Sequence, residues 1–195
     1  MSISYGFAER LAFSHGQTRN AKIETILMAE IPGAVSVEKA ELADDRNGTD
    51  YWVNRQNGHA LSVDAKVRAQ DWTLRGADDL ALEVWSVVER KKLGWTRDQN
   101  KQTDYIIWLW ADTGRWCLVP FPMLCSVARR MMPKWCQSYK TAEQWTPDGQ
   151  YHSMCVFVPR RVVWAEMYRA FGGQPQSEKK KGASWGGGHM PIWRR

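Results

Sequence analysis

Hydrophobic residues recur along this chain with two different periods, which separate helical from extended segments. Apolar residues three and four positions apart are typical of an amphipathic helix, and glycine or proline commonly ends one. The third helical pattern, for example, is followed by Pro133, where we expect that helix to end. Helices are predicted over residues 4–13, about 19–31, about 122–132 and about 160–171.

Stretches of alternating or continuously apolar residues lie between these helical segments and predict β-strands. Gln56-Asn57-Gly58 is typical of a tight hairpin turn, so the strands on either side of it should pair. Residues 105–110 are apolar throughout, as expected for a strand that is covered on both faces. Strands are predicted over residues 51–53, 61–68, 80–88, 105–110, 116–119 and 154–158.

The order of these elements predicts a mixed α/β (α+β) fold that opens with an antiparallel meander of three strands. The chain of 195 residues is long enough for one domain, which we place over residues 1–171. Residues 172–195 contain little core-forming material before Ile192 and are expected to form a flexible tail.

Composition argues against several classes of protein. No segment approaches the roughly 18 consecutive apolar residues of a spanning helix, so no membrane association is expected. The first residues lack a charged start followed by an apolar run, which predicts no secretory signal and a cytoplasmic location. The four cysteines contain no CxxC pair, so we expect thiols packed as small core residues and no zinc site.

The net charge of +6 is concentrated near the C-terminal end. From Gly172 onward five basic residues oppose one acidic residue, whereas the preceding 171 residues carry a net charge of only +2. Lys179, Lys180 and Lys181 are therefore expected to attract nucleic-acid phosphates without sequence preference, and such binding weakens steeply with salt. The overall charge is compatible with a nucleic-acid partner.

Two aspartates and a lysine form the arrangement that most suggests chemistry. Asp50 opens the strand before the hairpin, and Asp64 lies on the strand after it, with Lys66 two positions later on the same face. Pairing of the two strands should bring both carboxylates to one edge of the sheet. Paired carboxylates would hold a hard cation such as Mg²⁺, and the lysine would orient or deprotonate a water beside it. These are the parts that metal-assisted phosphodiester hydrolysis needs.

Ordinary structural roles stay open for the same residues. Asp64 and Lys66 could form an exposed ion pair on one face of a strand, and Asp50 could be a turn residue. Two further acid-x-Lys triplets lie in a charged loop and in the tail. The triplet at Asp64 differs because it lies in mid-strand behind a hairpin partner that begins with aspartate, and this context favours the functional interpretation.

The segments Gly48-Thr49-Asp50-Tyr51 and Ser62-Val63-Asp64-Ala65-Lys66 resemble the motif of the PD-(D/E)XK nuclease superfamily, which has the restriction-endonuclease-like fold. Thr49 stands where the superfamily commonly has proline. The resemblance covers about residues 14–110 and implies an αβββαβ core with a central mixed sheet flanked by helices. Residues 44–50 are also similar to small phage or mobile-element proteins of this type.

The resemblance implies a Mg²⁺- or Mn²⁺-dependent endonuclease that acts on DNA. It implies metal ligands at Asp50, Asp64 and the backbone carbonyl of Ala65, and a catalytic lysine at Lys66. The superfamily often adds an acid from the preceding helix, where Glu24 stands, although Glu24 could equally be solvated. Many members act as dimers, so a homodimer is also suggested. The alternative is a non-catalytic DNA-binding or protein-interaction module that retains the fold.

A few other side chains are candidates for contacts around this site. Arg68, Lys91 and Lys92 could bind phosphates, although runs of charge are usually solvated surface. Glu83 could pair with Arg68, bind a metal or face solvent, and we favour the pairing. Trp95 is one of five tryptophans in polar stretches, which could stack on unpaired bases or cover apolar patches.

Overall fold

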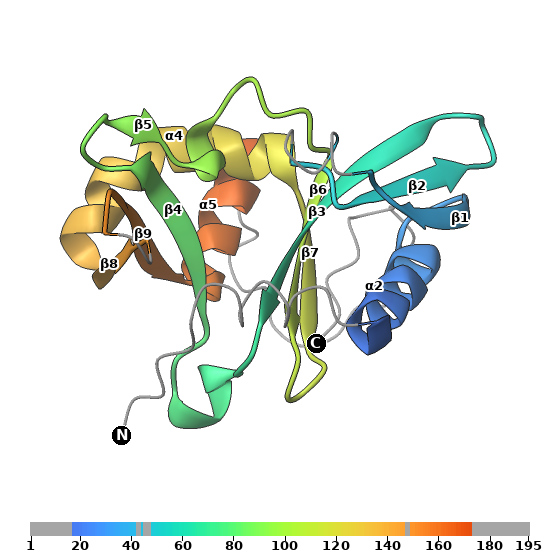
Figure 1. The fold of residues 1–195 in the computed structure, drawn as a ribbon, viewed down its shortest axis with the longest axis horizontal. Helices are drawn as coiled ribbons and strands as arrows, with labels where there is room; N and C mark the ends of the chain where they lie inside the picture. The colour runs from blue at the N-terminus through green and yellow to red at the C-terminus, as the bar shows by residue number, and fades with distance from the viewer. Residues whose placement is uncertain (1–16, 42–43, 45–47, 147–148, 173–195) are drawn as a thin grey trace, which may run out of the picture.

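The computed structural model describes residues 17–41, 44, 48–146 and 149–172, which form an α+β fold with two β-sheets (Figure 1). The helix predicted over 4–13 and the tail beyond residue 172 lie outside these ranges. None of the helices within them is long and apolar enough to cross a membrane. In chain order the elements are α2 (Gln17–Glu30), β1 (Ala34–Lys39), β2 (Tyr51–Arg55), β3 (Ala60–Arg68), the 3-10 helix η1 (Trp72–Arg75), β4 (Asp79–Val87), β5 (Lys92–Leu93), the 3-10 helix η2 (Trp95–Arg97), β6 (Tyr105–Trp110), β7 (Trp116–Pro120), α4 (Phe121–Ser138), β8 (Thr141–Trp145), β9 (His152–Pro159) and α5 (Arg160–Phe171).

Five strands form a mixed sheet in the order β1-β2-β3-β6-β7. β1, β2 and β3 are antiparallel neighbours, and the predicted turn at Gly58, whose φ is 79°, joins β2 to β3. β6 then pairs parallel to β3, with Ile106 beside Asp64, and β7 returns antiparallel to β6. The mixed α/β class predicted from the sequence is therefore confirmed.

A second sheet of four antiparallel strands has the order β5-β4-β9-β8. The chain leaves the mixed sheet after β3, forms β4 and β5 in this second sheet, and returns at β6. Our placement of the strand over 80–88 in the opening meander was wrong, because β4 pairs with the distant β9 and β1 is the third meander strand. The connection from β3 to the parallel β6 thus runs through strands and 3-10 helices, where the implied αβββαβ core has a helix.

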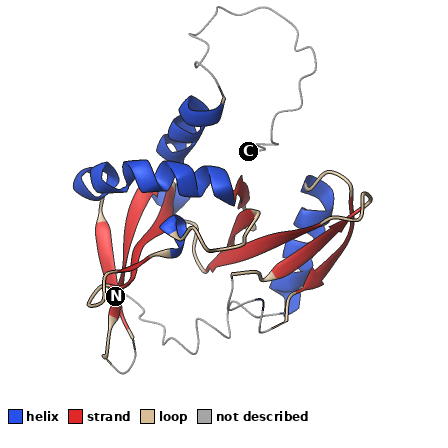
Figure 2. Cartoon of the chain, turned by 90° about the horizontal axis from the view of Figure 1, so that it is seen from above, coloured by secondary structure: helices blue, strands red, loops and turns tan. Residues whose placement is uncertain are grey.

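Two hydrophobic cores lie on opposite faces of the mixed sheet. α2 covers one face, and Figure 2 shows it against the sheet at the right of the view, with α4 and α5 beside the other sheet. β6 contributes Ile107 and Leu109 to the core under α2, and Ile106 and Trp108 to the core between the two sheets, α4 and α5. This strand is covered on both faces, as its continuous apolar run predicted.

Helix α4 continues through Pro133, so the predicted end at that proline was wrong. Proline inside a helix costs about 3 kcal/mol, since it removes one backbone hydrogen bond and crowds the preceding turn. Here Pro133 is exposed, while Met132 and Trp135 on either side of it are buried in the core. Burial of these two large side chains offsets the cost of the proline. Trp135 therefore belongs to the core and not to a base-stacking surface.

A cluster of ion pairs ties the segment that leaves β3 to β7 and to the start of α5. The Asp71 carboxylate accepts the Thr73 backbone N–H at 3.0 Å, which caps η1, and pairs with Arg115 Nε at 2.7 Å. Arg115 also lies 3.0 Å from Asp78, which pairs with Arg160 at 2.9 Å. Burial alone would raise the pKa of Asp71, but the hydrogen bonds from Arg115 and Thr73 hold it well below its usual value.

We expect Arg115→Met to lower the free energy of unfolding by about 2–4 kcal/mol at pH 7, because Asp71 would remain buried without its cation. A carboxylate whose pKa is depressed by folding stabilises the protein above its unfolded pKa, and that contribution is lost as the pH falls through the folded value. The loss caused by Arg115→Met should therefore shrink as the pH is lowered below about 4. Urea unfolding from pH 7 to pH 3 measures it, with the exposed Arg129→Met as control. Equal losses at both ends of this range would contradict the explanation.

Candidate active site

Asp64 and Lys66 project from β3 toward the interior of the molecule, between the two sheets. They lie beside Ile106 and Trp108 of the parallel β6, whose side chains enter the core between the sheets. Asp64 is only 2 % exposed, and Lys66 is half-buried. An exposed ion pair, the alternative weighed for these two residues, does not describe the site.

Asp50 comes directly before β2, and its backbone and side chain both bind β3. Its N–H donates to the Val63 carbonyl at 2.9 Å, and its Oδ2 accepts the Ala65 N–H at 2.6 Å. The carboxylate thus takes the place of a strand partner for Ala65. In a strand the N–H and the C=O of one residue point to the same edge, so the Ala65 carbonyl faces the side on which Asp50 lies.

The carboxyl groups of Asp50 and Asp64 converge. Burial and the negative charge of Asp64 raise the pKa of Asp50 to about 7, although the Ala65 N–H and Lys66 act in the opposite direction. The convergence predicted from the hairpin is therefore present, and it places two acidic side chains close enough for their negative charges to repel each other. Like-charged groups this close are costly, and they occur where a cation or a shared proton relieves them.

Two lysines neutralise Asp64, one on each oxygen. Lys66 Nζ lies 2.7 Å from Oδ1, and Lys101 Nζ lies 2.5 Å from Oδ2. Burial alone would raise the pKa of Asp64, but the two ammonium groups outweigh it and hold the pKa below its usual value. Burial would likewise lower the pKa of Lys66, and the carboxylate of Asp64 reverses this, so Lys66 is protonated at neutral pH.

Lys101 is the functional candidate that the sequence analysis missed. It lies in the loop before β6, and its side chain reaches Asp64 by passing over Gly48. A Cβ at Gly48 would clash with Lys101 Nζ, and the φ of +89° at this position also favours glycine. The Thr103 hydroxyl donates to the Gly48 carbonyl at 2.8 Å and fastens the two loops together. Glycine at 48 thus makes room for the second lysine.

Trp95 forms the floor of the site. The ammonium groups of Lys66 and Lys101 lie 5.2 and 5.9 Å from the centre of its ring, within the range of cation–π attraction. The ring itself packs against Trp108 and Phe121, which fixes its position. In this structure Trp95 therefore contributes to the site by holding the ammonium groups of Lys66 and Lys101 over its ring.

A third acid, Glu83 of β4, faces the same group of charges from the second sheet. Its Oε2 accepts a hydrogen bond from the backbone N–H of Trp95 at 3.0 Å. Burial raises the pKa of Glu83, and the charges of Lys66 and Lys101 are near enough to oppose that rise. Its pairing with Arg68 stays a prediction.

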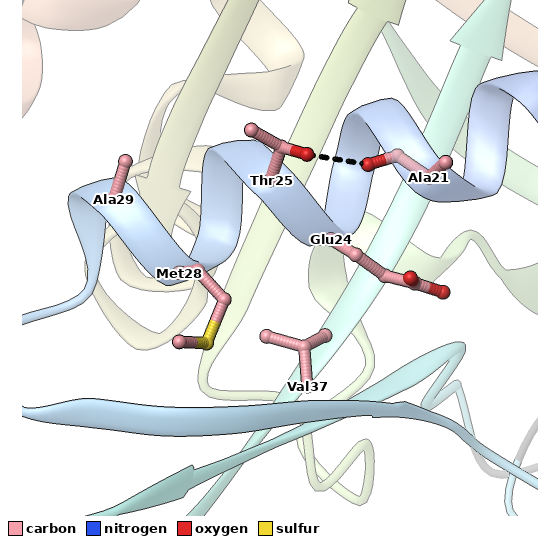
Figure 3. A pocket seen from close by; sticks show the side chains of 6 residues that line it. All are labelled: Ala21, Glu24, Thr25, Met28, Ala29 and Val37. Carbon is pink, nitrogen blue, oxygen red and sulfur yellow. Dashed lines mark hydrogen bonds between the residues drawn. The ribbon is translucent and has the colours of Figure 1, made fainter.

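Glu24, the further acid predicted for the site, lies on α2. It projects from α2 beside Val37 of β1 and lines a shallow groove with Met28 (Figure 3). α2 covers the face of the mixed sheet opposite to the one from which Asp64 projects. The pKa of the Tyr51 hydroxyl is raised mainly by burial and further by the charges of Asp50 and Glu24, so this hydroxyl is near both acids. The role of Glu24 as a further acid of the site stays a prediction, and the proposal below does not depend on it.

The predicted phosphate contacts lie at the rim or outside the described residues. Arg68 is exposed at the end of β3, Lys91 is exposed in the turn between β4 and β5, and Lys92 is exposed at the start of β5. Lys92 is close enough to act on the pKa of Glu83, so this turn borders the site. The tail lysines lie outside the described residues.

The donor set fits Mg²⁺ or Mn²⁺. Among the described residues, no group of three or more His, Cys, Asp and Glu side chains is arranged around a metal position. The donors that converge are the carboxylates of Asp50 and Asp64, with the Ala65 carbonyl on the same strand edge. Mg²⁺ is commonly held by one or two carboxylates and keeps several waters, so oxygen donors of this number suit it.

Comparisons of the chain with models of protein families, with curated proteins and with solved structures find no match. The functional argument therefore rests on the residues of the site.

Proposed function

We propose that the protein is a Mg²⁺- or Mn²⁺-dependent endonuclease of the restriction-endonuclease-like fold that hydrolyses DNA phosphodiester bonds. The observation that carries the proposal is the convergence of Asp50, Asp64 and Lys66 in one partly buried site. A divalent ion bound there would act as a Lewis acid on the phosphate and lower the pKa of a water. Asp50, Asp64 and the Ala65 carbonyl would hold it.

Lys66 acts in this proposal as a cation and hydrogen-bond donor. Asp64 Oδ1 lies 2.7 Å from its ammonium group and raises its pKa, which favours the protonated form. Its ammonium group is held by Asp64 Oδ1 and the face of Trp95, which limits its movement. A fixed donor stabilises the charge that develops on the phosphate without reorganising during the reaction.

The charge balance of the site also supports a phosphate substrate. Three carboxyl groups, those of Asp50, Asp64 and Glu83, face the ammonium groups of Lys66 and Lys101. With every group ionised, negative charge exceeds positive charge by one, which would repel a phosphate. A bound divalent ion removes that excess of negative charge, so a phosphate is no longer repelled.

We expect Lys66→Met to reduce the cleavage of supercoiled plasmid in Mg²⁺ by about 10²–10³-fold, because it removes a fixed positive donor. Mn²⁺ binding should persist in this variant, since both carboxylates remain. The matched control is Lys134→Met, which removes an exposed lysine from α4. Gel assays of cleavage with calorimetric Mn²⁺ titrations measure both effects. Undiminished cleavage by Lys66→Met would contradict the assignment, and a wild-type protein that binds DNA without cutting it would favour the non-catalytic alternative.

A further inference from the structure

Lys101 occupies one of the two Asp64 oxygens that are available as metal ligands. Lys101 Nζ lies 2.5 Å from Asp64 Oδ2, while Lys66 takes Oδ1. On Asp50, Oδ2 is already engaged by the Ala65 N–H. Both oxygens of the central carboxylate and one oxygen of its neighbour are therefore occupied by protein donors.

Of the two lysines, Lys101 is the one that can leave. Lys66 lies on β3, and the pairing of its backbone with Trp108 of β6 holds it in place. Lys101 lies in a loop whose neighbours Asn100 and Gln102 are exposed, and it reaches Asp64 through a long side chain that crosses Gly48. The side chain of Lys101 is 10 % exposed and that of Lys66 is 28 % exposed, so the distinction between the two lysines rests on the loop position and long reach of Lys101 and not on exposure.

We propose that Lys101 is a resident counter-cation of Asp64, which a divalent ion must displace, and that it thereby sets the metal affinity of the site. The inference rests on the proposed metal site at Asp50 and Asp64. Lys101 stabilises the buried carboxylate while the site is free of metal, and the stabilisation that it provides is subtracted from the free energy of metal binding. Lys101 is a positioning residue in this proposal, since its effect is exerted through Asp64.

Titration of the full-length protein with Mn²⁺ alone at pH 7.5, followed by calorimetry, tests the proposal without any measurement of activity. Lys101→Met should bind Mn²⁺ about tenfold more tightly than the wild type, which corresponds to about 1.4 kcal/mol. Lys101→Gln, which keeps a polar side chain of similar reach, should shift the affinity in the same direction if the methionine variant folds poorly. Lys134→Met, which removes an equal charge from α4, should bind as the wild type does.

The outcomes of this titration distinguish the proposed role of Lys101 from the proposed metal site at Asp50 and Asp64. Unchanged or weaker Mn²⁺ binding by both Lys101 variants, with binding by the wild type that Asp64→Asn abolishes, overturns the role of Lys101 and leaves the metal site standing. A wild-type protein that binds no Mn²⁺, or an Asp64→Asn variant that binds it equally well, overturns the metal site and this inference together. Tighter binding by Lys101→Met and by Lys134→Met alike would attribute the gain to net charge and also overturn it.

Discussion

Replacing Asp50 by Asn should make the metal-free protein more stable at pH 8. The pKa of Asp50 is raised from 3.8 to about 7, so the folded protein holds a proton that the unfolded chain releases. Stability is therefore lost as the pH rises from about 4 to about 7, and the loss levels off above that range. One pKa unit is worth about 1.4 kcal/mol, and after allowance for partial exposure we expect Asn to recover about 1–2 kcal/mol.

The amide oxygen that Asp50→Asn introduces would still accept the Ala65 N–H, so the strand contact is kept. Thermal unfolding in EDTA from pH 4 to pH 8 measures the effect, which should grow with pH. Added Mg²⁺ should raise the melting temperature of the wild type and leave that of Asp50→Asn unchanged, because only the wild type binds the ion. A variant less stable than the wild type at pH 8 in EDTA would show that the two carboxylates do not repel each other.

Replacing Asp64 by Asn should have the opposite effect on stability. The ammonium groups of Lys66 and Lys101 would lose the carboxylate between them, and removing one partner from a buried ion pair typically costs about 3–5 kcal/mol. Plasmid cleavage should fall by on the order of 10³-fold, because a proposed metal ligand is lost with it. Urea unfolding and gel assays measure the two losses.

The double variant Asp64→Asn with Lys101→Met provides the control for this explanation. It removes one of the two ammonium groups left without a partner, so it should recover part of the lost stability while cleavage stays absent. A double variant less stable than Asp64→Asn alone would show that Lys101 stabilises the fold by contacts other than that with Asp64.

Local signals in the sequence were sufficient for most individual elements. The alternation over 61–68 and the turn at Asn57-Gly58 predicted β3 and its pairing with β2, because both depend on neighbouring residues. The strand β1 was missed, since its six residues, AVSVEK, alternate only in part and follow a Pro-Gly turn. β8 was missed because its five residues are all exposed and therefore carry no apolar pattern. Strand order was beyond reach where, as for β4 and β9, the partners are distant in sequence.

In the candidate site, too, residues brought together locally could be predicted and a residue distant in sequence could not. Asp50, Asp64 and Lys66 were predictable because one hairpin brings them together. Lys101 was not predictable, because it lies 37 positions after Asp64 in the sequence and its approach depends on a glycine in a third segment. The sequence does contain Gly48 close to Asp50, but a glycine alone does not indicate that a lysine passes over it. The structure shows this through the positive φ of Gly48 and its closeness to Lys101. Glu83 was noted in the sequence, but its place opposite the lysines follows from the second sheet.

Cleavage of supercoiled plasmid in Mg²⁺ by the wild type and by Asp50→Asn, side by side, tests the central claim most directly. Asp50→Asn is expected to be folded and more stable than the wild type, so a loss of cleavage in this variant cannot come from unfolding. The wild type should convert the plasmid to nicked or linear forms, and EDTA should stop it, while Asp50→Asn should leave the plasmid intact. Equal cleavage by the two proteins, or no cleavage by the wild type in Mg²⁺ or Mn²⁺, would contradict the account.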